Sequence, residues 1–209
     1  MAIKERRERE KREHRQRILD AASAIIREEG FAALSMRKLA ERIEYSPAAI
    51  YLVFKNREEI AQELSEQGFG ELLDALTKAV ASKRSAEALH ALGAAYIAFG
   101  LEHPEIYRLI FMGDSDYMKA AYAAHSLDTA AVKTYDVLLE LARQLQEGKA
   151  ESEVAAVAEM IWCALHGIVS LHITCAAFLS ASPQSLAKLV TQTLATGFGC
   201  TLVEGQGEH

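Results

Sequence analysis

The sequence predicts an almost entirely α-helical protein. Half of its 209 residues are hydrophobic, whereas it contains only 12 glycines and 3 prolines. Apolar residues recur at intervals of three and four along most of the chain, which is the spacing of one helix face, and the strict alternation typical of a half-buried strand is rare. This length and apolar content suffice for one large core or for two small domains.

The first expected core helix spans about residues 15–29. Its apolar face consists of Ile18, Leu19, Ala22, Ile25 and Ile26. Gly30 then predicts a helix end in the left-handed conformation, which glycine adopts without steric cost. Phe31 and Leu34 are expected to fill the corner of a three-helix core.

The next stretch predicts two short helices joined by a tight turn. Ser35 is a good N-cap for a helix over 36–43, because its hydroxyl can accept a hydrogen bond from a backbone N–H of the first turn. Ser46 caps a second helix that runs from Pro47 to Phe54, and proline is favoured at that first position because its missing N–H costs nothing there. Two helices of this length with so short a turn are typical of a helix-turn-helix, whose second helix lies in a DNA major groove.

A third helix follows the second with almost no linker. Glu44 and Tyr45 form the turn between the first two helices. Asn56 is expected to cap the third helix, and Glu59, three residues later, completes a pair similar to a capping box.

The charges are divided unevenly along the chain. Residues 1–60 contain 14 Lys or Arg and 11 Asp or Glu, a net charge of +3. The remaining residues contain 9 and 18, a net charge of −9, so that the whole chain carries −6. A basic head on an acidic body is typical of a DNA-binding module joined to a module that does not bind DNA.

The first 17 residues carry eight Lys or Arg and four Glu. One interpretation is a basic arm that contacts DNA phosphates or enters a minor groove. The other is a solvated helical extension with i,i+4 ion pairs in the favourable order, each contributing about 0.2–0.5 kcal/mol. The expected pairs are Glu5–Arg9, Glu8–Arg12 and Glu13–Arg17. Both interpretations hold if a frayed helix docks on DNA.

Five segments of the head carry a family resemblance: ILDAA at 18–22, EEGF at 28–31, LSMRKLAERI at 34–43, SPAAIY at 46–51 and FKNREEI at 54–60. With these motifs, residues 15–60 resemble the DNA-binding domain of the TetR family of bacterial transcriptional repressors. The resemblance implies a protein that binds double-stranded operator DNA. Two positions depart from the pattern, because Glu44 stands where the family usually has Gly and Val53 where it often has Tyr or His. Glu44 is therefore expected to adopt a strained or altered turn.

The expected DNA contacts lie on the two helices of the helix-turn-helix and beside their ends: Ser35, Arg37, Lys38, Ser46, Pro47, Ala48, Ala49, Tyr51 and Lys55. Tyr51, Lys55 and the serine hydroxyls are expected to position phosphates. Arg37 and Lys38 are the best polar candidates for reading bases, and the alternative is that they too contact only phosphates. The two alanines cannot hydrogen-bond to a base, but they can contact thymine methyl groups.

The body is expected to be a series of helices: 56–82, 85–102, 104–111, 117–147, 151–179 and 183–197. Ser85 is expected to cap the second of them, and His103 ends it because a proline pushes the preceding residue out of the helical region. The expected division is a DNA-binding domain with a basic arm over 1–60, a helical effector-binding and dimerisation domain over 61–204, and a disordered tail over 205–209.

Two motifs of the body resemble one C-terminal subgroup of the same family. They are HPEIYRLIFMG at 103–113 and Trp162 followed by His166 and Gly167. The resemblance implies a domain that binds a small molecule and forms a homodimer through a four-helix bundle of the last two long helices of each subunit. The residues support this independently, because the helix over 151–179 has more apolar faces than one monomer can bury.

The candidate ligand-binding residues are aromatic or sulfur-containing, with one histidine: Tyr96, Phe99, Tyr107, Phe111, Met112, Trp162, Cys163 and His166. Residues of these types at helical spacing are also typical of a core, and this alternative stays open for each of them. No cluster of Arg or Lys is available to hold an anion. The expected effector is therefore a small, mainly apolar or aromatic molecule of unknown identity.

Neither an enzyme nor a bound cofactor is expected. Cys163, His166, His172 and Cys175 have a spacing suggestive of metal ligands, but Cys163 and His172 lie on opposite faces of a straight helix, so no metal site is expected. The sequence contains no nucleophile elbow, no HExxH and no phosphate-binding loop. A constitutive architectural DNA-binding protein without an effector is the first alternative function, and ligand-dependent release from DNA would distinguish it from a repressor. A Cys/His metal-dependent enzyme is the second alternative, and its single tetrahedral site would need a break in the helix at Gly167.

The segment 160–182 contains no Asp, Glu, Lys or Arg and is long enough to span a bilayer of about 30 Å. It includes several polar residues, so a helix buried at a subunit interface explains it more simply than a membrane span. The charged N-terminus lacks the apolar segment of a signal peptide, and the three cysteines form no disulfide framework. A cytoplasmic location without a membrane span is therefore expected.

Overall fold

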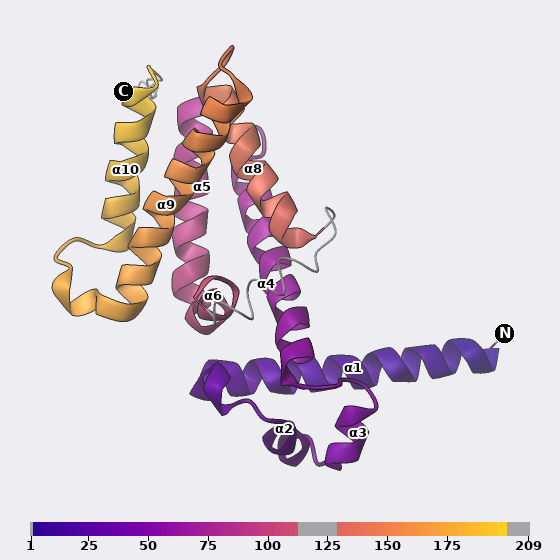
Figure 1. Ribbon diagram of the computed structural model, residues 1–209. Helices are drawn as coiled ribbons and strands as arrows, with labels where there is room; N and C mark the ends of the chain where they lie inside the picture. The colour runs from indigo at the N-terminus through magenta and orange to yellow at the C-terminus, as the bar shows by residue number, and fades with distance from the viewer. Residues whose placement is uncertain (1, 113–128, 200–209) are drawn as a thin grey trace, which may run out of the picture. The chain divides into compact units, whose positions relative to one another are not determined.

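Helices account for the regular structure throughout the residues that the computed structural model describes, 2–112 and 129–199 (Figure 1). These two ranges contain no strand, in agreement with the expected all-α fold. They divide into two compact units. The first holds the residues up to Gly68 together with α6 (Pro104–Phe111), and the second holds Phe69–His103 and residues 129–199.

The first unit is built around one apolar core. It is shared by α1 (Ala2–Glu29), α2 (Met36–Arg42), α3 (Pro47–Tyr51) and the first half of α4 (Arg57–Val80). Its largest side chains are almost fully buried: Ile18, Leu19, Ile25, Ile26, Leu34, Leu39, Ile50, Phe54 and Ile60. Burial of each such side chain stabilises the fold by about 1.5–3 kcal/mol, which is why so small a unit can hold its helices in place.

α1 is longer than the core helix expected over about 15–29, because it includes the N-terminal segment. It begins at Ala2 rather than near Arg15, and the side chains of residues 4–13 are exposed. The ion pairs of this extension include Arg6–Glu10 at 3.4 Å and Arg9–Glu13 at 3.7 Å. In both pairs the arginine comes first, which is the reverse of the Glu-before-Arg order expected from the sequence. The extension is thus a solvated helix, as one of the two interpretations proposed.

Two turns of the first unit have positive φ angles. Gly30 follows α1 with φ 81° and ψ 164°, a region essentially restricted to glycine and different from the left-handed helical conformation that was expected. Glu44, between α2 and α3, has φ 57°. This left-handed conformation confirms the strained turn expected where glutamate replaces glycine.

α3 ends at Tyr51, although the sequence predicts that it continues to Phe54. The N–H groups of Val53 and Phe54 both donate to the Ile50 carbonyl oxygen at 2.9 Å, which tightens the end of the helix. Phe54 enters the core after this turn, whereas Leu52 stays exposed to solvent.

The second unit is centred on α5 (Ser85–Glu102), which packs against three other helices (Figure 1). These are α8 (Ala130–Leu145), α9 (Glu151–Cys175) and α10 (Pro183–Gly197). The second half of α4 belongs to the same unit.

Small and polar residues allow α5 and α10 to approach closely. A Cβ atom on Gly93 would lie 2.8 Å from Cγ2 of Thr191, so only glycine fits there without a shift. One turn earlier on α5, Nδ1 of His90 lies 3.1 Å from Oγ1 of Thr191. The threonine is buried, and its hydroxyl also donates to the Ala187 carbonyl at 2.8 Å.

Three helix ends of the body differ from the predictions. α5 begins at Ser85, but no side chain caps it, so the expected serine cap is wrong. α8 ends at Leu145 rather than 147, and Gly148 has φ 81° in the turn that follows. α9 ends at Cys175 and continues as a 3-10 turn, Ala176–Phe178.

Some expectations fall outside the described residues, namely the loop after Phe111, residues 117–128 of the helix expected over 117–147 and the tail at 205–209. Within the described residues that helix begins only at Ala130, because Thr129 has an extended backbone and its hydroxyl accepts from the Val132 N–H at 3.3 Å, so the expected unbroken helix is wrong. The expected domain boundary after residue 60 stays a prediction. α4 runs through that position without a break, and the compact units part at Gly68.

The substitution Gly68→Ala is expected to destabilise the first unit by about 1–3 kcal/mol. A Cβ atom at Gly68 would lie 2.7 Å from Cγ2 of Ile106 and 3.3 Å from Cγ2 of Ile110, so α4 and α6 would have to move apart. The matched variant Gly70→Ala meets nothing within 4 Å and should instead stabilise α4 by about 0.5–1 kcal/mol. Urea unfolding followed by circular dichroism measures both changes, and effects of the same sign would contradict this packing.

Candidate functional site

The helix caps of the helix-turn-helix form as the sequence predicts. The Ser35 hydroxyl accepts from the Lys38 N–H at 3.2 Å, and the Ser46 hydroxyl accepts from the Ala49 N–H at 3.2 Å. The two caps therefore fix the residue at which each helix begins, and each satisfies one backbone N–H of the first turn that has no partner within the helix.

The third cap is reciprocal, with one difference from a standard capping box. The Asn56 side-chain oxygen accepts from the Glu59 N–H at 2.8 Å. The Glu59 carboxylate accepts from the N–H of Lys55, one residue before the cap, at 2.7 Å. This pair fixes the start of α4 directly after the end of α3.

The side chains of the predicted DNA face are largely accessible. Ser35, Arg37, Ser46, Pro47, Ala48, Tyr51 and Lys55 are exposed, and Lys38 and Ala49 are half-buried. Tyr51 is 55% exposed, although it is a large aromatic residue on a five-residue helix. Ile50, beside it, is fully buried and anchors the helix to the core.

The two basic residues of α2 already have acidic partners. Nε of Arg37 donates to Glu41 one turn later at 2.8 Å, and this hydrogen bond raises the pKa of the arginine. The Lys38 ammonium pairs with Glu29 at the end of α1. The Arg37–Glu41 pair is largely solvent-exposed and the Lys38–Glu29 pair partly so, and surface ion pairs are weak, so DNA phosphates can displace the carboxylates.

A second contact holds α2 to α1. The Arg42 guanidinium forms two hydrogen bonds with the Glu28 carboxylate, at 2.9 and 2.6 Å. This arginine lowers the pKa of Glu28.

Arg15 connects α1 to the end of α3 and to α4. Its guanidinium pairs with the Glu63 carboxylate on α4 through two nitrogens, one of them at 3.0 Å. A third nitrogen contact runs to the Val53 carbonyl oxygen at 3.3 Å, just after α3. The guanidinium also lies over the Phe54 ring, 4.2 Å from its centre. One side chain of α1 thereby fixes the end of α3 and the first turns of α4.

The turn of the helix-turn-helix is held to α1 as well. The Arg17 guanidinium donates to the Tyr45 hydroxyl at 2.8 Å. The ring of His14 packs edge-on against the Tyr45 ring, with centres 4.9 Å apart. Tyr45 is therefore positioned from outside the motif by two residues of α1.

Leu52 is an exposed large hydrophobic residue of the head that the sequence analysis did not select. It follows the last residue of α3 and is 86% exposed. Because the predicted helix was longer, Leu52 was not expected at a helix end. Leu52 comes four residues after Ala48 and three after Ala49, and this helical spacing could have revealed that it extends their apolar face.

Among the predicted ligand-binding residues, the structure brings Tyr96 and Trp162 together. The Trp162 indole N–H donates to the Tyr96 hydroxyl at 3.1 Å, and Tyr96 is 1% exposed. Phe99 is also buried, and its ring centre lies 5.3 Å from that of His103. These aromatic residues form part of the core of the second unit.

The other predicted ligand-binding residues have different environments. Tyr107 and Phe111 belong to the first unit, where their ring centres are 4.8 Å apart. Met112 and Cys163 are exposed. His166 is half-buried, and burial lowers its pKa. A ligand site made by all eight residues stays a prediction.

Tyr135 was missed by the sequence analysis. Its ring centre lies 6.3 Å from that of Trp162. Burial, followed by the nearby Glu159 carboxylate, raises the pKa of Tyr135. It thus extends the Tyr96–Trp162 pair to α8, a connection that depends on tertiary contacts and has no sequence motif.

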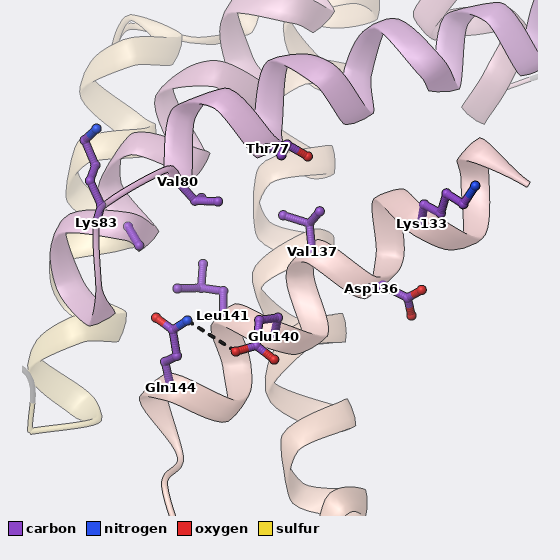
Figure 2. A pocket seen from close by; sticks show the side chains of 10 residues that line it. Thr77, Val80, Lys83, Lys133, Asp136, Val137, Glu140, Leu141 and Gln144 are labelled. Carbon is purple, nitrogen blue, oxygen red and sulfur yellow. Dashed lines mark hydrogen bonds between the residues drawn. The ribbon is translucent and has the colours of Figure 1, made fainter. Parts of the chain in front are cut away.

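A cavity of about 300 Å³ lies elsewhere in the second unit, between the end of α4, the start of α5 and α8 (Figure 2). Its apolar lining is Val80, Ala88, Val137 and Leu141, with Thr77 beside them. Its polar lining is Lys83, Lys133, Asp136, Glu140 and Gln144. None of the predicted ligand-binding residues lines it.

Within the described ranges, no group of three or more His, Cys, Asp or Glu residues is arranged to hold a metal ion. The segment Glu151–Phe178 is long and apolar enough to cross a bilayer by length and composition alone, with a mean hydropathy of 1.8. A core helix of a soluble protein passes the same test, so this is weak evidence for a membrane span.

Two family models match the chain. The model for bacterial regulatory proteins of the tetR family matches residues 18–64. The model for the tetracyclin repressor-like C-terminal domain matches residues 89–196, which is more than half of the chain. Both family and fold are those of transcriptional regulators and not of enzymes.

Individual relatives agree with these matches. The uncharacterized HTH-type transcriptional regulator YobS of Bacillus subtilis (strain 168) is 29% identical over 90 residues, which are 43% of this chain and 47% of that protein. The chain spans less than half the length of the curated relatives it matches, between 40% and 47%.

Solved structures show the same fold over most of the chain. A protein of unknown function from Rhodococcus sp. RHA1 has a TM-score of 0.72 at 23% identity, covering 88% of this chain and 94% of that one. The fatty acid degradation regulator FadR from Bacillus halodurans has a TM-score of 0.67 at 20% identity, covering 87% and 94%.

The substitution Arg15→Ala is expected to lower the free energy of unfolding by about 1–2 kcal/mol, because it removes a hydrogen-bonded ion pair and a cation–π contact that are only partly exposed. Arg15→Lys keeps the charge but not the paired hydrogen bonds, so its effect should be intermediate. Arg12→Ala, in the exposed extension of α1, is the matched control and should change stability little. Urea unfolding measures all three, and equal stability of Arg15→Ala and Arg12→Ala would contradict the role given to Arg15.

Proposed function

This chain belongs to the TetR family of bacterial regulatory proteins, and we propose that it is a ligand-responsive repressor. In this proposal a homodimer binds a near-palindromic operator, and a small, mainly apolar molecule releases it. The observation that carries the proposal is the accessible face of α2 and α3, presented by the buried core of the first unit. A cytoplasmic location follows from this function.

The phosphate contacts are expected from groups at the helix ends. Ser35 and Ser46 direct the first N–H groups of α2 and α3, and the N-terminus of a helix favours a phosphate. Tyr51 and Lys55 are exposed on the same motif and can reach the DNA backbone. Arg37 and Lys38 would exchange their carboxylate partners for phosphates or base edges.

Base reading is expected to be mainly apolar. Pro47, Ala48 and Ala49 offer no side-chain hydrogen bond to a base, but an alanine methyl can contact the methyl group of thymine. Leu52 adds a larger apolar side chain at the other end of α3. Sequence discrimination should therefore depend on thymine methyl groups and on DNA shape.

The exposed faces of α9 and α10 support the proposed homodimer. Large apolar side chains on them are accessible, with Met160 at 41%, Leu171 at 48% and Leu189 at 61%. Gly167 lies between the first two, and a Cβ atom added to it would meet no atom within 4 Å, so its lack of a side chain serves no packing in the monomer. A second subunit packed on this face would bury the apolar groups and use the close approach that glycine permits.

α4 is the element through which an effector can act on DNA binding. Its first turns carry Glu63, the partner of Arg15, and its last turns carry Thr77 and Val80 of the cavity. A ligand that binds one position of this helix better than another shifts the population of DNA-binding conformations. The spacing of two heads, about 34 Å for one DNA turn, would change with it.

The proposal is tested by footprinting the purified protein on its own upstream intergenic DNA, with and without a panel of apolar small molecules. We expect a protected near-palindrome and at least one compound that abolishes protection. Specific protection that no compound releases would instead favour the constitutive architectural protein. A lack of any specific protection would refute the DNA-binding function.

Replacing thymine by uracil in the protected operator is expected to weaken binding, because each lost methyl contact costs about 0.8 kcal/mol, or roughly fourfold in affinity. In the variant Leu52→Ala, replacing the thymine that Leu52 contacts should no longer weaken binding, because that methyl contact is already lost. Lys55→Ala is the matched control, since loss of a phosphate contact should weaken binding to both DNAs equally and reduce the salt dependence. Gel shifts measure these affinities, and an unchanged affinity for the uracil operator would contradict apolar base reading.

A further inference from the structure

The exposed extension of α1 carries a stripe of unpaired basic residues on one side. Lys4, Arg7 and Lys11 follow one another at intervals of three and four residues, so their side chains lie along one face of the helix. All three are exposed, and none of them forms an ion pair with another described residue. These three residues form a basic stripe that the helix-turn-helix does not include.

The opposite side of the extension is neutralised. Arg6 pairs with Glu10 at 3.4 Å, and Arg9 pairs with Glu13 at 3.7 Å. At 100° per residue, all four lie about 90° or more from the middle of the basic stripe. Glu8 is the carboxylate of the extension nearest to the stripe, and it lies about 70° from its middle. The side that bears the basic stripe is therefore the one that keeps a net positive charge.

The basic stripe continues the face of α1 that packs against the helix-turn-helix. Seven residues are close to two whole helical turns, so Lys11 lies on the same side of α1 as the buried Ile18. Arg7 is related in the same way to His14, whose ring packs against Tyr45 in the turn between α2 and α3. Figure 1 shows the N-terminal part of α1 running on beyond α3, where the stripe stays uncovered.

The spacing of the basic stripe is compatible with a DNA backbone. At 1.5 Å per residue, neighbouring cations of the stripe are about 4.5 and 6 Å apart along the helix axis. Each DNA strand carries one phosphate per about 3.4 Å of its axis, so a strand that runs along the stripe offers at least one phosphate to each cation. When α3 lies in a major groove, the phosphates that line this groove stand on either side of it.

We propose that Lys4, Arg7 and Lys11 bind phosphates of the DNA backbone beside the groove that α3 enters. Such contacts strengthen binding and orient the head, but they carry no sequence information. The inference rests on the proposed function for the position of the DNA, whereas the contacts themselves require no particular operator sequence.

The stripe variant, Lys4→Gln with Arg7→Gln and Lys11→Gln, tests this inference. Fluorescence anisotropy of a labelled duplex of mixed sequence measures the affinity of the full chain between about 50 and 200 mM NaCl. Each lost phosphate contact lowers the slope of log affinity against log salt by about 0.9, so the slope should become shallower by about 2.7 for each bound chain. The wild-type chain should therefore lose about 40-fold more affinity than the stripe variant over this range of salt.

The matched control is Arg6→Gln with Arg9→Gln and Arg12→Gln. It removes the same number of positive charges from the same segment, at positions about 90° or more from the middle of the basic stripe. Its slope should stay close to that of the wild-type chain. Circular dichroism verifies that both variants keep their helices, which is expected because all six side chains are exposed.

The inference is overturned if the stripe variant keeps the wild-type slope, or if both variants lower the slope equally. In either case the stripe does not face the DNA in preference to solvent or to an acidic protein surface. Footprinting decides the proposed function separately. A wild-type slope with a protected operator would sink only the stripe, whereas the expected loss of slope without any protected site would leave the stripe and sink the regulator.

Discussion

The contacts of Arg15 are the constraint on which the DNA-binding head depends. The proposed recognition helix, α3, has only five residues, and a helix this short has little stability of its own. Its position must therefore come from its surroundings. Ile50 anchors it from inside the core, and Arg15 holds the chain just after it through the Val53 carbonyl and the Phe54 ring. The same guanidinium pairs with Glu63, so that α1, the end of α3 and α4 are held by one side chain.

Local features of this head could be predicted from the sequence, whereas its long-range contacts could not. The caps at Ser35, Ser46 and Asn56 each join residues three positions apart, so the local sequence is sufficient to predict them. The partners of Arg15 lie 38 and 48 positions away, and nothing in a basic helix indicates which arginine will be used. Glu44 is an intermediate case, because a missing glycine predicted a strained turn but not its geometry.

The body shows the same limit in another form. The spacing of apolar residues predicted most of its described helices, because burial of one face is what holds each helix in place, but it missed the start of α8 at Ala130. It did not predict the cavity, whose lining comes from α4, α5 and α8. The aromatic residues that were expected to bind a ligand include Tyr96 and Phe99, which are buried in the core of the second unit. Size and polarity are shared by core and ligand-binding residues, so only the packing distinguishes them.

Hydrogen–deuterium exchange of the full chain, with and without its operator, would test most directly whether α2 and α3 form the DNA-binding face. Specific DNA should slow exchange in residues 35–38 and 46–55, where backbone N–H groups and exposed side chains are expected to meet the DNA, and an unrelated duplex should have a smaller effect. Slowed exchange confined to the extension of α1, with no change between Ser35 and Lys55, would contradict this account.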